Sequence, residues 1–145
     1  MLTYPMKFRV KCAAQSGINV NWQSATNSME QALPSAIPPE FGGPGKGFSP
    51  EDFYALAMVN CYIATFKIYA EKSNLQYQEI TAELVLDVDR DEKGFPWMAR
   101  AEMNVKLYQA SPKEKAEALL NKAVKGCLVM NSIKTEKTVN FELID

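Results

Sequence analysis

A capped, almost wholly apolar segment near the middle of the chain is the feature that most restricts its fold. The stretch SPEDFYALAMVNCYIATF begins at Ser49, a residue type that caps helices, and continues with proline at the first helical position and two acidic residues in the first turn. The apolar run over residues 53–66 is interrupted by two polar residues and is shorter than the roughly 18 to 20 residues that span a bilayer. We therefore predict a long buried central helix that ends near residues 73–74.

Alternating apolar and polar residues predict strands on both sides of this helix. Residues 6–12 and 18–23 have the pattern of a half-buried antiparallel hairpin with its turn around Gly17. Residues 80–88 and 97–107 predict a second, longer hairpin, closed by the polar turn DRDEKG. The segment between the first hairpin and the helix is rich in proline and glycine, and we expect it to be a long connection.

A second helix and a last strand complete the expected fold. Ser111 and Glu114 have the spacing of a capping box, and the apolar residues that follow recur at helical intervals as far as Val124, with Gly126 as the stop. Residues 139–143 alternate as a strand. The order β-β-α-β-β-α-β, with hairpins between paired strands, predicts one α+β domain over all 145 residues. We expect an antiparallel β-sheet, a long buried central helix and a second, amphipathic helix.

Charge and composition exclude several classes of function. The chain has 16 basic and 17 acidic residues, so no excess charge favours nucleic acid or an anionic membrane as a partner. It contains no histidine, which excludes Ser-His and Cys-His catalytic pairs and histidine-bearing zinc sites, and we expect no metal. The first twenty residues lack the hydrophobic region of a secretory signal, so we expect a cytoplasmic protein.

The three cysteines, at positions 12, 61 and 127, are too few for a disulfide framework, and any pairing in a reducing compartment would be transient. Cys12 shares the apolar face of the first strand and is expected to be a small core residue. Taken alone, Cys61 also favours packing. Cys127 follows Gly126 at the start of a short helical turn, where free N–H groups lower the pKa of a thiol.

Two segments together resemble the paired signatures of the OsmC/Ohr family, the osmotically inducible and organic-hydroperoxide-resistance proteins. The segments are GGPGKGFSPEDFYALAMVNCYIATFK and KAVKGCLVMNSIK. The matching elements are the loop Gly42 to Gly45, Pro50-Glu51, Cys61-Tyr62, and Cys127 with Asn131. The resemblance covers nearly the whole chain and implies an OsmC-like fold that forms an intertwined homodimer.

The resemblance also implies a thiol-dependent peroxidase that reduces small organic hydroperoxides to alcohols. Cys61 matches the peroxidatic cysteine and Cys127 the resolving one, and their disulfide would be reduced by an external thiol or dithiol, such as a lipoyl-type compound, with no bound cofactor. We expect Met58 and Tyr62 to line a largely apolar pocket that favours alkyl hydroperoxides over hydrogen peroxide.

In the family, the glutamate that opens the central helix holds an arginine near the first hairpin turn. Glu51 matches the glutamate, but Gln15 or Ser16 stands near the expected place of the arginine. Ten residues of helix separate Glu51 from Cys61, about 15 Å along the axis and roughly 80° around it. One compact site would therefore need Glu51 from a second chain in a two-fold dimer. A role for Glu51 only in helix capping and the helix dipole stays open.

A second hypothesis keeps the same fold and the same facing cysteines. In it the protein has no peroxidase turnover and acts as a small-molecule binding protein or a thiol redox sensor. The two hypotheses differ in whether Cys61 turns over a hydroperoxide.

Overall fold

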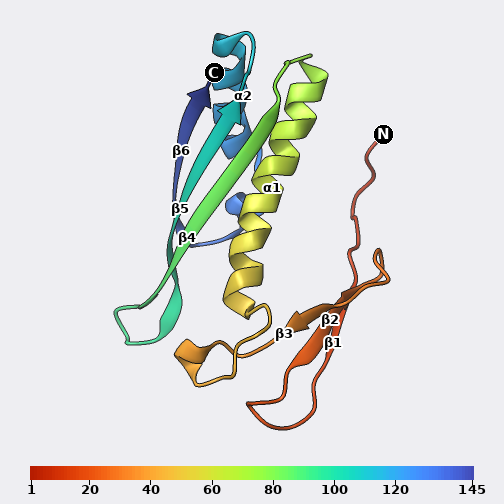
Figure 1. Cartoon of the computed structure of the whole chain (residues 1–145), viewed down its shortest axis with the longest axis vertical. Coiled ribbons are helices and arrows are strands. Elements are labelled where there is room, and N and C mark those ends of the chain that lie inside the picture. The colour runs from red at the N-terminus through yellow and green to blue at the C-terminus, as the bar shows by residue number, and fades with distance from the viewer. The chain divides into compact units, whose positions relative to one another are not determined.

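The strands form two separate three-stranded sheets (Figure 1). The structure is a computed structural model that describes residues 1–145. By their contacts these residues divide into two compact units, Met1–Phe53 and Tyr54–Asp145. The expectation of a single domain stays a prediction.

The first unit contains a meander of three short antiparallel strands. They are β1 (Val10–Ala13), β2 (Trp22–Thr26) and β3 (Leu33–Ser35), in the order β1-β2-β3. The predicted hairpin exists, but both of its strands begin about four residues later than the alternation indicated. β3 was not predicted, because it has only three residues, one of them Pro34. A short 3-10 helix, η1 (Pro39–Phe41), follows it.

The predicted half-burial of the first hairpin is wrong for β1, whereas most residues of β2 are partly buried. All four residues of β1 are exposed, including Cys12, because no second layer within the unit covers them. The Cys12 sulfur lies 3.3 Å from the hydroxyl of Ser24 on β2. Cys12 is therefore an accessible thiol, not the core residue that its register suggested.

The central helix α1 (Pro50–Lys72) begins and ends where the sequence predicts. The Asp52 N–H donates to the Ser49 hydroxyl over 3.0 Å, and the Ser49 N–H donates to the Asp52 carboxylate over 2.9 Å. This reciprocal pair satisfies N–H groups that the first turn of a helix leaves free.

α1 is buried along one face, which packs in the core of the second unit. Its fully buried residues recur every four positions and are Met58, Tyr62, Phe66 and Ala70. Leu56 and Ile68, on other faces, are 41% and 52% exposed. By length and composition alone α1 could also cross a membrane, and one such helix is weak evidence for a membrane span.

The second unit contains a sheet in which the last strand runs parallel to its neighbour. β4 (Glu79–Arg90) and β5 (Pro96–Tyr108) form the predicted hairpin, and β6 (Glu136–Ile144) pairs with β5 in parallel. The prediction of a wholly antiparallel sheet is therefore wrong at β6. The reason is that α2 (Lys113–Gly126) and the short η2 (Met130–Ser132) carry the chain back along the sheet before β6 begins.

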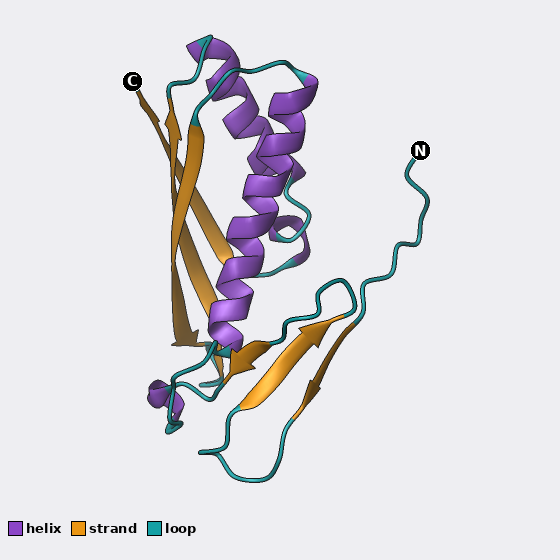
Figure 2. Cartoon of the chain, turned by 45° about the vertical axis from the view of Figure 1, so that its right-hand side comes forward, coloured by secondary structure: helices purple, strands orange, loops and turns teal.

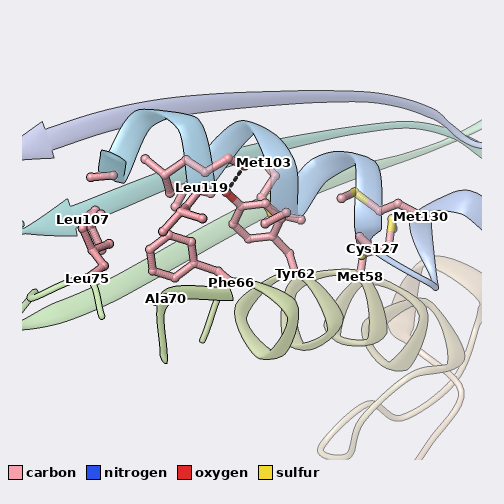
Figure 3. Close-up of a cluster of buried hydrophobic side chains, with 14 of the residues drawn as sticks. Met58, Tyr62, Phe66, Ala70, Leu75, Met103, Leu107, Leu119, Cys127 and Met130 are labelled. Atoms are coloured by element: carbon pink, nitrogen blue, oxygen red, sulfur yellow. Dashed lines mark hydrogen bonds between the residues drawn. The ribbon is translucent and has the colours of Figure 1, made fainter. Parts of the chain in front are cut away.

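Both helices cover the same face of this sheet, and the core lies between them and the strands (Figures 2 and 3). β5 supplies alternate residues to it: Ala99, Ala101, Met103, Val105 and Leu107.

α2 ends at Gly126 as predicted, but the predicted capping box is wrong: Pro112 is the N-cap, without a side-chain cap. The backbone of Ser111 pairs with that of Gln76 instead.

Candidate active site

The structure brings together the two cysteines that the sequence singled out. Cys61 is half-buried on α1, and Cys127 is fully buried directly after the last residue of α2. Cys127 belongs to the core cluster of the second unit, and Cys61 packs against that cluster. Neither cysteine forms a disulfide, so the structure describes the reduced form.

A short helical turn after Cys127 joins the two thiols. The backbone N–H of Val129, within this turn, donates to the sulfur of Cys61 over 3.4 Å. The turn is closed by the Asn131 N–H, which donates to the carbonyl oxygen of Cys127 over 3.0 Å. The side-chain amide of Asn131 donates to the carbonyl oxygen of Lys125 over 2.8 Å and ties the turn to the end of α2.

The environment of Cys127 favours its neutral thiol. The pKa of Cys127 is raised from 9.0 to about 11, chiefly by burial and in smaller part by a hydrogen bond with Cys61 and the charge of that residue. The N–H groups of Met130 and Val129 act in the opposite direction but are outweighed. The expectation that the turn lowers this pKa is therefore corrected, because desolvation dominates.

The expected pocket residues lie beside Cys127 but are closed off from solvent. Figure 3 shows the side chains of Met58 and Tyr62 within the buried cluster that contains Cys127, and each is 0% exposed in the isolated chain. The Tyr62 hydroxyl donates to the carbonyl oxygen of Leu120 over 3.0 Å, and burial, with the charge of Cys127, raises the pKa of Tyr62. A pocket lined by these two residues stays a prediction.

Glu51 lies in the first turn of α1, ten positions before Cys61 in one continuous helix. The capping hydrogen bonds use Asp52 instead. One carboxylate oxygen of Glu51 is buried without a hydrogen-bond partner, and Glu51 takes part in none of the ion pairs of the chain. The structure therefore gives Glu51 no partner within the single chain.

Comparison with known proteins then identifies the family. The family model described as OsmC-like protein matches residues 43–142. The chain belongs to the OsmC-like protein family. The match includes the loop before α1 from Gly43 onward, both helices and the two cysteines of the site. All but the first residue of the paired segments of this OsmC-like chain therefore lie inside the matched region.

Relatives of this OsmC-like chain include the uncharacterized protein YmaD of Bacillus subtilis, 26% identical over 111 residues that cover 74% of each chain. An OsmC-like protein of unknown function from Vibrio cholerae has the same fold, with a TM-score of 0.81, 15% identity and coverage of 97% of this chain and 100% of that one. An organic hydroperoxide resistance protein from Legionella pneumophila has a TM-score of 0.70, 21% identity and coverage of 99% and 100%. At these identities the solved structures establish the fold alone.

Three contacts of the OsmC-like site were not predicted from the sequence. They are the hydrogen bond from the Val129 N–H to the Cys61 sulfur, the hydrogen bond from the Asn131 amide to the Lys125 carbonyl oxygen, and the capping role of Asp52. Asn131 was noted as part of a motif, but a motif does not say what its side chain binds. The expectation of a helical turn after Gly126 was the only signal for the contact at Val129.

Proposed function

We propose that this protein is a thiol-dependent peroxidase that reduces organic hydroperoxides to alcohols. The observation that carries the proposal is the pairing of a half-buried Cys61 with a buried Cys127 whose neighbouring turn donates a hydrogen bond to the Cys61 sulfur. Membership of the OsmC-like family, which the organic hydroperoxide resistance protein of Legionella shares in fold, supports the same chemistry.

In the first step the thiolate of Cys61 attacks the terminal oxygen of the hydroperoxide, the one that bears hydrogen. The O–O bond breaks, the alkoxide takes a proton and leaves as the alcohol, and Cys61 is oxidised by two electrons to a sulfenic acid. Attack by Cys61 rather than Cys127 is favoured, because Cys61 is partly exposed while Cys127 is buried and its pKa is raised to about 11.

In the second step the sulfur of Cys127 attacks the sulfenic sulfur of Cys61. An S–S bond forms, and the hydroxyl of the sulfenic acid takes the thiol proton and leaves as water. An external dithiol, such as a lipoyl-type compound, then reduces the disulfide by thiol–disulfide exchange and becomes a cyclic disulfide itself. The cytoplasm, where thiols are kept reduced, is the compartment that suits this cycle.

We infer that the working form is a homodimer with the central helices antiparallel. The outward faces of α1 carry exposed apolar side chains, including Leu56 at 41% and Ile68 at 52%. The partnerless buried oxygen of Glu51 would then face a cation of the assembled site. Met58 and Tyr62 would border the alkyl group of the hydroperoxide once side chains near Cys61 move to admit it.

Two observations favour a second function, a small-molecule binding protein or thiol redox sensor without turnover. Met58 and Tyr62 have no exposed surface in the single chain, and no arginine stands at the first hairpin turn. A sensor needs only one oxidation of Cys61, whereas a peroxidase needs repeated access for substrate and reductant.

Turnover distinguishes these functions. We expect the protein to consume many equivalents of cumene hydroperoxide in the presence of dihydrolipoate, and to act more slowly on hydrogen peroxide. Cys61→Ser should abolish consumption, while Cys12→Ser, which changes an exposed thiol of the first unit, should leave the rate unchanged. A wild-type rate no higher than that of Cys61→Ser would leave the sensor or binding function.

A further inference from the structure

We propose that the backbone N–H of Val129 is the hydrogen-bond donor that holds negative charge on the Cys61 sulfur. The inference rests on the proposed function in one respect, namely that Cys61 is the thiol that reacts. The donor is a main-chain group, and sequence motifs do not reveal such groups.

The geometry of the donor is specific. The Val129 nitrogen lies 3.4 Å from the Cys61 sulfur, an ordinary length for a hydrogen bond to the large sulfur atom. This N–H takes part in no backbone hydrogen bond of the turn, whereas the N–H groups of Asn131 and Ser132 donate to the carbonyl oxygens of Cys127 and Val129. The Val129 N–H is therefore free to donate to the Cys61 sulfur. It also lowers the pKa of Cys127 through a hydrogen bond.

Neither the neighbouring turns of α1 nor the core cluster of the second unit offers Cys61 a charged group that would do this work instead. One helical turn away on α1, positions 57, 58, 64 and 65 carry Ala, Met, Ala and Thr. The core cluster against which Cys61 packs, built from α1, α2 and the sheet, is apolar apart from its tyrosines and cysteines. Cys127 is the titratable group in that cluster whose pKa responds to Cys61, and its retained proton adds no negative charge.

A main-chain donor is suited to a half-buried thiolate. Hydrogen bonding to the charged form of an acid favours that form, while apolar burial disfavours it. The turn that carries Val129 is fixed at both ends, by the Asn131 amide on Lys125 and by the Ser132 hydroxyl, which donates to the carbonyl oxygen of Leu128 over 2.8 Å. The donor is thus held in place before the thiol ionises, and ionisation needs no rearrangement.

The junction Gly126-Cys127 allows a direct test, because a synthetic peptide of residues 127–145 can be joined to the rest of the chain by ligation at its N-terminal cysteine. Replacing Val129 by α-hydroxyvaline changes one N–H to an ester oxygen and keeps the side chain. The matched control replaces Leu128 by α-hydroxyleucine, since the Leu128 N–H does not contact Cys61. Val129→Pro is a simpler variant that also removes the N–H, and circular dichroism checks the fold of each.

The readout is the pKa of Cys61, measured from the pH dependence of iodoacetamide alkylation with peptide mapping in a Cys12→Ser background. We expect the ester at 129 to raise this pKa by about one unit, a tenfold smaller thiolate fraction below the pKa, and the ester at 128 to leave it unchanged. Equal pKa values in the two esters would overturn the inference. The result does not depend on peroxidase turnover, so an inactive wild-type protein would reject the proposed function and leave the inference standing.

Discussion

Gly126, the last residue of α2, lies against the hydroxyl of Tyr69 on α1 with no room between them for a Cβ atom. Tyr69 is also held by α2 itself, since the Lys122 ammonium lies 4.7 Å from the centre of its ring. The contact fixes the approach of the end of α2 to the helix that carries Cys61. Because Cys127 follows Gly126 directly, this close contact lies one residue from the buried thiol.

Gly126→Ala is expected to lower the free energy of unfolding by about 1 to 3 kcal/mol, although alanine is intrinsically better in a helix by about 1 kcal/mol. The added methyl group displaces Tyr69 or the end of α2, and urea unfolding measures the loss. Lys125→Ala, in the same exposed turn, should change stability by no more than about 0.5 kcal/mol. Tyr69→Phe removes the colliding hydroxyl, so the double variant should recover part of the loss; additive losses would contradict the account.

At the start of α1, we expect capping and function to depend on different residues. Ser49→Ala and Asp52→Ala should each lower the free energy of unfolding by about 1 kcal/mol, because each removes one of the reciprocal cap hydrogen bonds. Glu51→Gln should leave stability within about 0.5 kcal/mol of wild type and lower the peroxidase rate. Thermal unfolding and turnover on cumene hydroperoxide check both parts. A Glu51→Gln variant that is destabilised like the cap variants, with normal turnover, would return Glu51 to a capping role.

Asn131 is expected to position Cys127 through its hydrogen bond to Lys125. Asn131→Ala should lower the free energy of unfolding by about 0.5 to 1.5 kcal/mol and slow the formation of the Cys61–Cys127 disulfide after one addition of peroxide. Asn121→Ala is the matched control, because the Asn121 amide donates in the same way to Glu117, four residues back, over 3.0 Å. Equal rates of disulfide formation in the two variants would reject the positioning role.

The raised pKa of Cys127 predicts a dependence of stability on pH. The folded pKa, about 11, exceeds the ordinary 9.0, so the folded state retains a proton that the unfolded state loses as the pH rises. Stability from this group is full below about pH 9 and is lost as the pH rises towards about 11. Cys127→Ala should reduce the fall in the free energy of unfolding, measured with urea, as the pH rises from about 9 to 11. A smaller fall should remain, because the pKa of Tyr62 is raised as well. An unchanged fall would contradict the burial of an ionisable thiol.

Local sequence signals predicted the parts of the fold that local physics determines. The bounds of α1 followed from a cap residue and an apolar run, and the β4–β5 hairpin followed from two alternating segments with a polar turn. The parallel pairing of β6 did not follow, because alternation reveals which side chains share a face but not which way a strand runs beside its neighbour. The exposure of Cys12 was missed for a related reason: an apolar register does not say whether any layer covers it.

The site was predicted in its residues and not in its contacts. Cys61 and Cys127 were identified by resemblance, and the structure brings them together through the turn at Val129. A main-chain donor leaves no trace in side-chain identity, since almost every residue has an N–H. The partner of Glu51 could not be predicted either, because the single chain contains none for it.

The intact mass of the reduced protein after one equivalent of cumene hydroperoxide tests the central claim most directly. We predict that wild type and Cys12→Ser lose two hydrogens within seconds, as a Cys61–Cys127 disulfide forms. Cys61→Ser should show no change of mass, and Cys127→Ser should gain oxygen at Cys61 without losing those hydrogens. A wild-type mass that does not move within minutes would contradict the assignment of Cys61 as a peroxidatic thiol.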